Sequence, residues 1–269
     1  CWMISNFNLN LIKILNILEN KNNKFILGLS GGLDSMALLY LLQKFINENK
    51  RLKIDLIPVI IDHNLRSESN KEAKEVKKIS ESLGFETKII KITELKPSGN
   101  IQNWARKQRR NILFKKCVEL SANLILAHHF DDQVETLFMR IVKETALDGL
   151  TGMSKISTWN GISILRPLLT YKKKQIKNYV KRKEIRYFED PSNINLKFER
   201  VKTRYVLDYL KNKVWPDIYE DLSNLSNLSS NLLKKTNFVF NIWAKKNILI
   251  NEAGAVRVNY KGFKTIFDR

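Results

Sequence analysis

The sequence predicts an α/β fold, a parallel sheet with helices on both faces, followed by a small C-terminal piece. Short apolar runs alternate with segments of helical apolar spacing, which is typical of parallel strands joined by helices. Polar and ionisable residues directly follow three of these runs. The alternation stops after Trp215 and Pro216. We therefore expect one domain at 1–214 and a small C-terminal region at 215–269.

The expected elements follow in chain order. The first expected elements are a helix at 7–20, a buried strand at 24–30, a helix at 34–49, a strand at 53–62 that contains Pro58, and a charged helix at 69–83. They are followed by a strand at 85–92, a basic helix at 101–121, a strand at 123–128, a helix at 130–144, a strand at 162–169 and a Lys-rich helix at 171–184. Beyond residue 215, DLSNLSNLSSNLLKK has helical spacing and NILINEAGAVRVNYKGF is typical of a hairpin.

Charge is the strongest signal in the composition. The 269 residues include 47 Lys and Arg against 27 Asp and Glu, which gives a net charge of +20. Such an imbalance favours polyanionic partners such as nucleic acid. The alternative is a compositional bias, since Lys, Asn and Ile are all abundant.

Other classes of protein are disfavoured by what the sequence lacks. No apolar run reaches the roughly 18 residues of a membrane span, and the start of the chain does not resemble a secretion signal, so we expect a cytoplasmic protein without a membrane partner. The two cysteines, Cys1 and Cys117, form no CxxC pair. We therefore expect neither a zinc site nor an iron–sulfur cluster.

The stretch KFILGLSGGLDSMALLY joins the first strand to the next helix. Gly31 and Gly32 would let backbone N–H groups face an anion at the helix N-terminus, and Ser30 and Ser35 would add hydroxyl donors. Asp34 would suit a Mg²⁺ ion that bridges phosphates. The GxSxG pattern in GLSGG also fits a nucleophilic serine, but that class needs a histidine late in the chain and no such histidine follows. An ordinary strand–helix turn is the third alternative.

Two further polar clusters lie at strand ends. DHNLR begins at Asp62 after the second strand, and HHFDDQ begins at His128 after the fourth. The carboxyl ends of parallel strands share one edge of the sheet, where ligands bind in open α/β folds. The three clusters together therefore indicate one site better than any of them alone.

SGGLDS resembles the pyrophosphate loop of the N-type ATP pyrophosphatases, the PP-loop superfamily. DHNLR, WARKQRRNILF, LAHHFDDQVETLFMR, DGLTGM, RPLL and EDPSNINLKFER occur in the order typical of the tRNA(Ile)-lysidine synthases, and the resemblance covers roughly residues 24–205. It implies an adenine-nucleotide alpha-hydrolase-like, Rossmann-like fold. It also implies a ligase that uses ATP and Mg²⁺ to join L-lysine to C2 of the wobble cytidine of tRNA(Ile) with a CAU anticodon. The implied reaction passes through an adenylated cytidine and releases AMP and pyrophosphate.

The resemblance also assigns roles to residues. ATP binding is expected at Ser30, Gly31, Gly32, Leu33, Asp34, Ser35, Asp62 and His129, with Asp34 as the metal ligand. Catalytic roles are expected for Asp34, Asp131, Asp132, Arg109 and Arg204. RNA binding is expected at Arg106, Arg166, Lys172, Lys173, Lys174 and Arg200. Because the lysine ε-amine must lose a proton to attack, a carboxylate such as Asp131 or Asp132 is needed near it.

The chain departs from the family pattern in two places. Lys143-Glu144-Thr145-Ala146 replaces a basic–Gly–x–Gly run, and Arg200-Val201-Lys202-Thr203-Arg204 lacks an expected Asn. The region after Trp215 is shorter than is usual in the family, where this part grips tRNA. Two alternatives stay open. One is another PP-loop tRNA-modifying enzyme, such as the 2-thiocytidine type, which needs paired cysteines. The other is a basic RNA-binding module with a decayed nucleotide site.

Overall fold

A computed structural model describes residues 2–18, 22–62, 68–94, 97, 99, 101–191, 195–252 and 254–259, without the side chains of Trp2, Gln102 and Ile250. Parts of the expected motifs lie outside these ranges: the HNLR part of DHNLR, residues 192–194 of EDPSNINLKFER, and Ala253 and the residues from 260 onward in the expected hairpin.

The main sheet confirms the expected parallel arrangement. Its strand order is β3-β2-β1-β4-β6-β5, and every neighbouring pair is parallel except β5 and β6. The strands are β1 (Lys24–Leu29), β2 (Asp55–Asp62), β3 (Lys88–Lys91), β4 (Asn123–Ile125), β5 (Ile156–Trp159) and β6 (Ile162–Leu165). The chain moves outward from β1 to β3 on one side and returns to β4 on the other. The carboxyl ends of β1 and β4 therefore flank a topological switch point.

Pro58 is tolerated in β2 although the strand is internal. A proline cannot donate a ladder hydrogen bond, which disfavours it in a central strand. The pairing of β2 with β3 starts only at Val59, opposite Lys88. Position 58 therefore lies where β2 has a neighbour on the β1 side alone.

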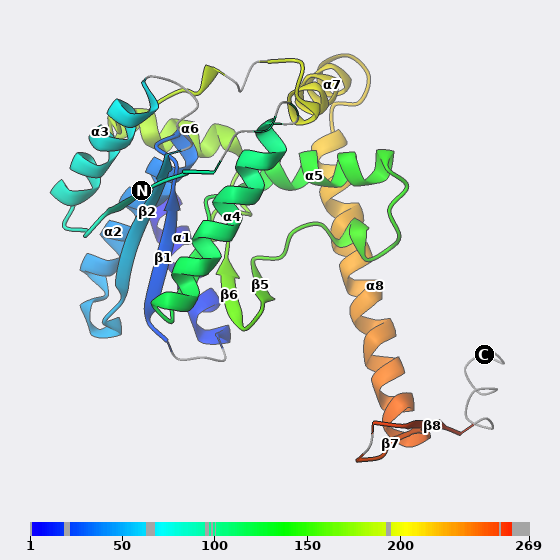
Figure 1. Ribbon diagram of the computed structural model, residues 1–269. Helices are drawn as coiled ribbons and strands as arrows, with labels where there is room; N and C mark the ends of the chain where they lie inside the picture. Colours follow the sequence, from blue (N-terminus) through cyan, green and yellow to red (C-terminus); the bar gives the residue numbers. More distant parts are fainter. Residues whose placement is uncertain are drawn as a thin grey trace.

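Helices cover both faces of the sheet (Figure 1). α1 (Trp2–Ile17), α2 (Leu33–Glu48), α3 (Ser69–Ser82) and α6 (Lys173–Arg182) share one core cluster with the face of β1 that carries Phe25, Leu27 and Leu29. α4 (Ile101–Glu119) packs on the other face, in the cluster that contains Ile26. The alternation of side chains along a strand explains how one apolar run serves two layers.

A separate helical unit stands beside the sheet. α5 (Phe130–Val142), α7 (Glu199–Lys213) and the first turns of α8 (Ile218–Asn247) share a small core that includes Val134, Leu207 and Leu222. The rest of α8 extends away from the sheet, and a hairpin of β7 (Ile248–Ile250) and β8 (Val256–Val258) lies at its far end (Figure 1). Two short 3₁₀ helices, η1 (Lys50–Leu52) and η2 (Gly149–Thr151), complete the described elements. Among the described helices none is long and apolar enough to cross a membrane.

Candidate functional site

The loop between β1 and α2 is held in a conformation that needs glycine. Gly31 has a φ of +77°, and a Cβ at this position would lie 2.7 Å from Cγ2 of Val76. The N–H of Phe188 donates to the carbonyl oxygen of Gly31 at 2.9 Å. Gly32 precedes α2 without a side-chain cap, so this helix presents unsatisfied N–H groups at its positive end.

The two loop serines face each other across the turn. Their hydroxyl oxygens lie 3.1 Å apart, and the Ser35 hydroxyl donates to the Gly32 carbonyl at 3.0 Å. The backbone N–H of Ser30 donates to the same Ser35 hydroxyl at 3.3 Å. Ser35 is thus part of the loop's own hydrogen bonding, while Ser30 is more exposed beside the cavity.

A cavity of about 420 Å³ opens beside this loop. Its walls come from the ends of β1 and β2, from α3 and α4, and from the segments after β4 and α6. The residues that line it and bear on chemistry are Ser30, Gly32, Asp34, Ser35, Asp62, Arg109, His128, Phe188 and Asp190. The structure thus brings residues of the loop, Asp62 of the second cluster and His128 of the third to one place, at the switch point where ligands bind in this class of fold.

Asp34 has the environment of a cation ligand. Its Oδ1 is buried without a hydrogen-bond partner among the described residues, and its Oδ2 lies 3.5 Å from Nε2 of His129. An unsatisfied buried carboxylate oxygen is costly, and a hard cation satisfies it well. The residue present here therefore fits a Mg²⁺ ion.

His129 caps α5 and links it to the loop. Its Nδ1 accepts from the N–H of Asp132 at 3.3 Å, and its own N–H donates to Oδ2 of Asp132 at 3.0 Å. A ring whose Nδ1 accepts carries its proton on Nε2, which faces Asp34. Burial alone would lower the pKa of His129, but its hydrogen bond to Asp34 and the nearby carboxylates of Asp132 and Asp131 outweigh burial and raise the pKa.

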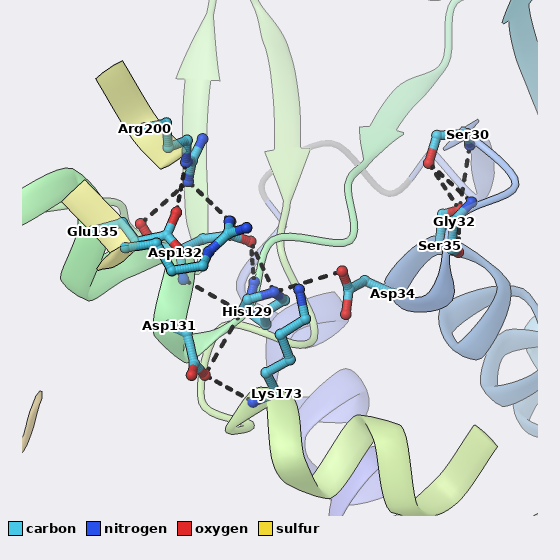
Figure 2. A network of polar contacts seen from close by, with 11 residues as sticks. Ser30, Gly32, Asp34, Ser35, His129, Asp131, Asp132, Glu135, Lys173 and Arg200 are labelled. Carbon is cyan, nitrogen blue, oxygen red and sulfur yellow. Dashed lines mark hydrogen bonds and ion pairs between the residues drawn. The ribbon is translucent and has the colours of Figure 1, made fainter. Parts of the chain in front are cut away.

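Asp132 and Glu135 on α5 form an ion-pair network with two arginines of α7 (Figure 2). Arg200 contacts Asp132 at 2.9 Å and Glu135 at 2.7 Å, and Arg204 contacts the other Glu135 oxygen at 2.8 Å. Burial opposes the charge of Asp132, yet the charges of His129 and Arg200 prevail and lower its pKa. A chain of contacts therefore runs from Asp34 through His129 and Asp132 to α7.

His128 is the histidine that lines the cavity. Its Nδ1 is buried without a partner among the described residues. Burial lowers its pKa to about 4, with help from Arg166, Arg200 and Arg106, against the opposing effect of Asp132. His128 is therefore neutral at physiological pH and presents an uncharged ring nitrogen in a cationic environment.

α4 contributes further arginines to this region. Desolvation by burial, together with the positive charge of Arg106, lowers the pKa of Arg109, and the negative charge of Asp190 opposes this shift. The pKa of Arg106 is lowered by burial and by Arg200. Both side chains still keep part of their surface exposed, so they remain within reach of a ligand.

The other expected site residues lie further out. Arg166 donates to the carbonyl oxygen of Ser154 and to the hydroxyl of Ser157, both at 2.9 Å, and so fixes the β5–β6 hairpin. The Asp131 carboxylate accepts from the N–H of Lys173 at 2.7 Å, at the start of α6. Lys172 pairs with Glu220 of α8, and Lys174 is exposed.

Sequence reasoning missed several residues of this region. Glu135, which is 2% exposed, and Asp190 lie within the motifs LAHHFDDQVETLFMR and EDPSNINLKFER but were given no role, and Phe188 was not considered. His129 was expected at the nucleotide, but it is absent from the cavity lining, and His128 is present. The sequence signal that could have found Glu135 is its spacing of three residues from Asp132, which places both on one helix face.

The sheet is open and mostly parallel, and a loop of the anion-binding type lies at its switch point. These features define the class of doubly wound α/β proteins that bind phosphate-bearing ligands. More particularly, the chain belongs to the PP-loop domain family, whose model matches residues 3–210.

The chain is also similar to curated proteins named tRNA(Ile)-lysidine synthase. It is 38% identical to one from Wolbachia pipientis wMel over 188 residues, which are 69% of this chain and 43% of that protein. It is 34% identical to one from Orientia tsutsugamushi (strain Boryong) over 216 residues, which are 80% of this chain and 46% of that protein. The chain thus spans about half the length of the curated relatives it matches.

Two solved structures share the fold. The U34-tRNA thiolase NcsA from Methanococcus maripaludis, solved with its [4Fe-4S] cluster, matches with a TM-score of 0.67 at 20% identity, over 84% of this chain and 80% of that one. NAD+ synthetase from Burkholderia pseudomallei matches with a TM-score of 0.50 at 12% identity, over 84% of this chain and 88% of that one. At these identities the likeness concerns the fold alone.

Proposed function

We propose that this chain joins the ε-amine of L-lysine to C2 of the wobble cytidine of tRNA(Ile) with a CAU anticodon. ATP is consumed, and AMP and pyrophosphate leave. The observation that carries the proposal is the identity of 34% to 38%, over 216 and 188 residues, with proteins named for this activity. The polar chain from the loop to α7 supplies groups that the reaction needs.

ATP is assigned to the cavity beside the loop. The N–H groups at the start of α2 and the hydroxyl of Ser30 would hold its pyrophosphate, and Arg109, which lines the same cavity, would neutralise part of its charge. Asp34, with its unpartnered Oδ1, would hold Mg²⁺, which when bound offsets the charge of the phosphates. Asp62, which lines the same cavity, lies at the end of β2.

Activation of the base is the chemical reason for consuming ATP. The oxygen on C2 of cytosine is a poor leaving group, and its attack on the α-phosphate of ATP releases pyrophosphate and leaves an adenylated oxygen. Attack of the lysine amine on C2 then expels AMP. The first step needs the base oxygen held against the α-phosphate, and the second needs the amine held against C2, so the site would contribute chiefly by positioning.

Asp132 is assigned to holding the lysine amine. Its pKa is lowered, so it stays ionised and attracts a cationic amine, but it is a weak proton acceptor. Arg200 and the N–H of His129 fix the carboxylate in place. Asp131, a quarter exposed and anchored by the N–H of Lys173, is the candidate for taking the proton.

RNA is assigned to exposed basic side chains of α4 and α6. Arg106 and Lys174 are exposed and suit phosphate contacts, whereas Arg200 and Arg204 serve mainly to position the carboxylates of α5. Residues 1–214 would form the PP-loop domain and residues 215–269 a region that contacts tRNA. Cys117 does not suit sulfur transfer, because burial raises its pKa to about 12 and keeps the thiol protonated.

The proposal is tested by following product formation with each substrate omitted in turn. Pyrophosphate and AMP, not ADP and phosphate, should appear when ATP, Mg²⁺ and unmodified tRNA(Ile) are all present. Asp34→Asn should abolish this release while the chain stays folded by circular dichroism, because the amide retains the shape but not the charge that holds the cation. Asp55→Asn is the matched control, since Asp55 lies at the opposite end of β2, paired with Lys24 on the surface. Normal release by Asp34→Asn would contradict the assignment of the loop.

A further inference from the structure

The outward face of α7 carries an aromatic and basic stripe that the site described above does not use. Lys202, Tyr205, Val206, Tyr209 and Lys213 recur at the helical spacing i, i+3, i+4, i+7 and i+11. All five are exposed, and Tyr205 and Tyr209 leave 66% and 57% of their surfaces to solvent. We refer to these five residues as the α7 stripe.

The helix that carries the α7 stripe is fixed from its inner side. Leu207 is buried in the core shared with α5 and α8, Thr203 is also buried, and Arg200 and Arg204 pair with Glu135. Positions near 203 and 207 lie on the opposite side of a helix from positions 202, 205, 206 and 209. α7 lies at the rim of the molecule (Figure 1), and the α7 stripe is one helix diameter, roughly 10 Å, from the side of the helix that contacts α5.

The chemistry of the α7 stripe selects its partner. Two exposed tyrosines offer flat π faces, and lysines stand at both ends of the row. Neither Lys202 nor Lys213 is paired with a carboxylate within the described ranges. α7 carries two acidic residues. Glu199, three residues before Lys202, pairs with Lys143 at 2.7 Å, and Asp208 accepts from the hydroxyl of Tyr219 at 3.2 Å. Tyrosine also suits protein interfaces, whose cores are depleted in lysine, so it is the lysines at both ends of the row that favour a polyanionic partner.

We propose that the α7 stripe binds unpaired nucleotides of the RNA substrate, with bases stacked on Tyr205 and Tyr209 and phosphates at Lys202 and Lys213. Aromatic platforms flanked by cations are a common way of holding single strands, because every base has a π face. This assignment rests on the proposed function, since it gives the α7 stripe the loop nucleotides that flank the reacting cytidine. Arg200 and Arg204, on the inner side of the same helix, would couple that grip to the carboxylates that hold the amine.

The test is an equilibrium binding measurement on the full chain, with a fluorescent anticodon stem-loop and a fully paired duplex of the same length. Tyr205→Ala and Tyr209→Ala should each weaken stem-loop binding on the order of tenfold and leave duplex binding unchanged. Tyr205→Phe and Tyr209→Phe are the matched controls, and both should bind like the parent chain because the stacking face remains. Lys202→Gln should reduce the slope of log affinity against log salt by about one.

Three results would overturn the assignment. The first is unchanged stem-loop binding by the alanine variants. The second is an equal loss in the phenylalanine variants, which would point to the hydroxyls rather than to stacking. The third is a parent chain that is dimeric in sedimentation and that the alanine variants make monomeric, which would assign the α7 stripe to a second copy of this chain.

Failure of the proposed function gives a different result. If lysine is never incorporated into tRNA but the alanine variants still lose stem-loop affinity, only the lysidine reaction is wrong. If lysine is incorporated and stem-loop affinity does not depend on Tyr205 or Tyr209, only the assignment of RNA binding to the α7 stripe is wrong. All of the substituted side chains are exposed, so the thermal midpoint should not change and serves as the control for folding.

Discussion

Glu135→Gln should destabilise the protein, because the Glu135 carboxylate joins two helices. Glu135 is 2% exposed, and its two oxygens accept from Nε of Arg200 at 2.7 Å and from Nε of Arg204 at 2.8 Å. Glutamine has the same shape but only one acceptor oxygen, and its NH₂ group would face the second guanidinium. One charged hydrogen bond is then lost, and a donor opposes a donor.

The expected loss follows from this geometry. A hydrogen bond to a charged group contributes about 1.5–3 kcal/mol to stability. The hydrogen bond that remains is also weakened, because a neutral amide oxygen replaces a carboxylate oxygen, and this adds a smaller loss. Water partly compensates, because Arg200 and Arg204 are 24% and 32% exposed. We expect the free energy of unfolding to fall by about 2–3 kcal/mol, which corresponds to roughly 4–12 °C in the thermal midpoint of a domain of this size.

Urea denaturation, followed by circular dichroism, measures the change. Glu81→Gln is the matched control, because Glu81 pairs with Lys77 on an exposed helix face and its loss should stay within about 0.5 kcal/mol. A loss for Glu135→Gln no larger than that of the control would refute the claim that the network holds α7 against α5. A double variant with Arg204→Met should lose less than the sum of the two single variants, since the residues share one interaction.

Other predictions concern the backbone turn and the histidine. Glu144 has a φ of +52°, in the left-handed region, at a position where glycine was expected from the family pattern; Glu144→Gly should therefore stabilise the protein by about 1 kcal/mol, whereas Glu144→Ala, which keeps the strain, should not. Equal effects of the two substitutions in denaturation would argue against backbone strain. The pKa of His129 is raised in the folded state, so its contribution to stability is fully present below its unfolded pKa and is lost as pH rises through the folded pKa. His129→Asn keeps a residue that caps the helix but removes the titrating ring. The difference in the free energy of unfolding between the parent chain and His129→Asn, measured by urea denaturation, should therefore shrink as the pH rises from about 6 to about 9. A difference that grows with pH would contradict the assigned contacts.

The sheet was readable from the sequence because buried parallel strands are short apolar runs. β1 and β2 were found within two residues of their bounds. β5 was missed, since it is a short edge strand in which Ile156 is followed by polar residues and by a partly exposed Trp159. α7 was missed because its apolar side chains, such as Tyr205 and Val206, face solvent, while Arg200 and Arg204 reach inward. Leu207 is buried on the inner side, so the apolar residues of α7 are divided between its two faces and mark no single apolar stripe.

The site was readable in outline only. Strand-end clusters predicted that the loop, Asp62 and the paired histidines would meet, because topology alone brings strand ends together. Which of His128 and His129 faces the cavity depends on how the chain leaves β4, and neighbouring residues in one motif do not settle that. The pairing of Arg200 with Glu135 joins residues 65 positions apart, and the sequence carries no local signal for it.

The most direct test of the central claim is the incorporation of radiolabelled lysine into tRNA by the parent chain. With ATP and Mg²⁺, label should enter unmodified tRNA(Ile) with a CAU anticodon and should be absent when ATP is omitted or when the wobble cytidine is replaced by uridine. Asp132→Ala should lose incorporation more than ATP binding, because the carboxylate holds the amine and not the nucleotide. Label in the uridine variant, or incorporation accompanied by ADP in place of AMP and pyrophosphate, would contradict the account.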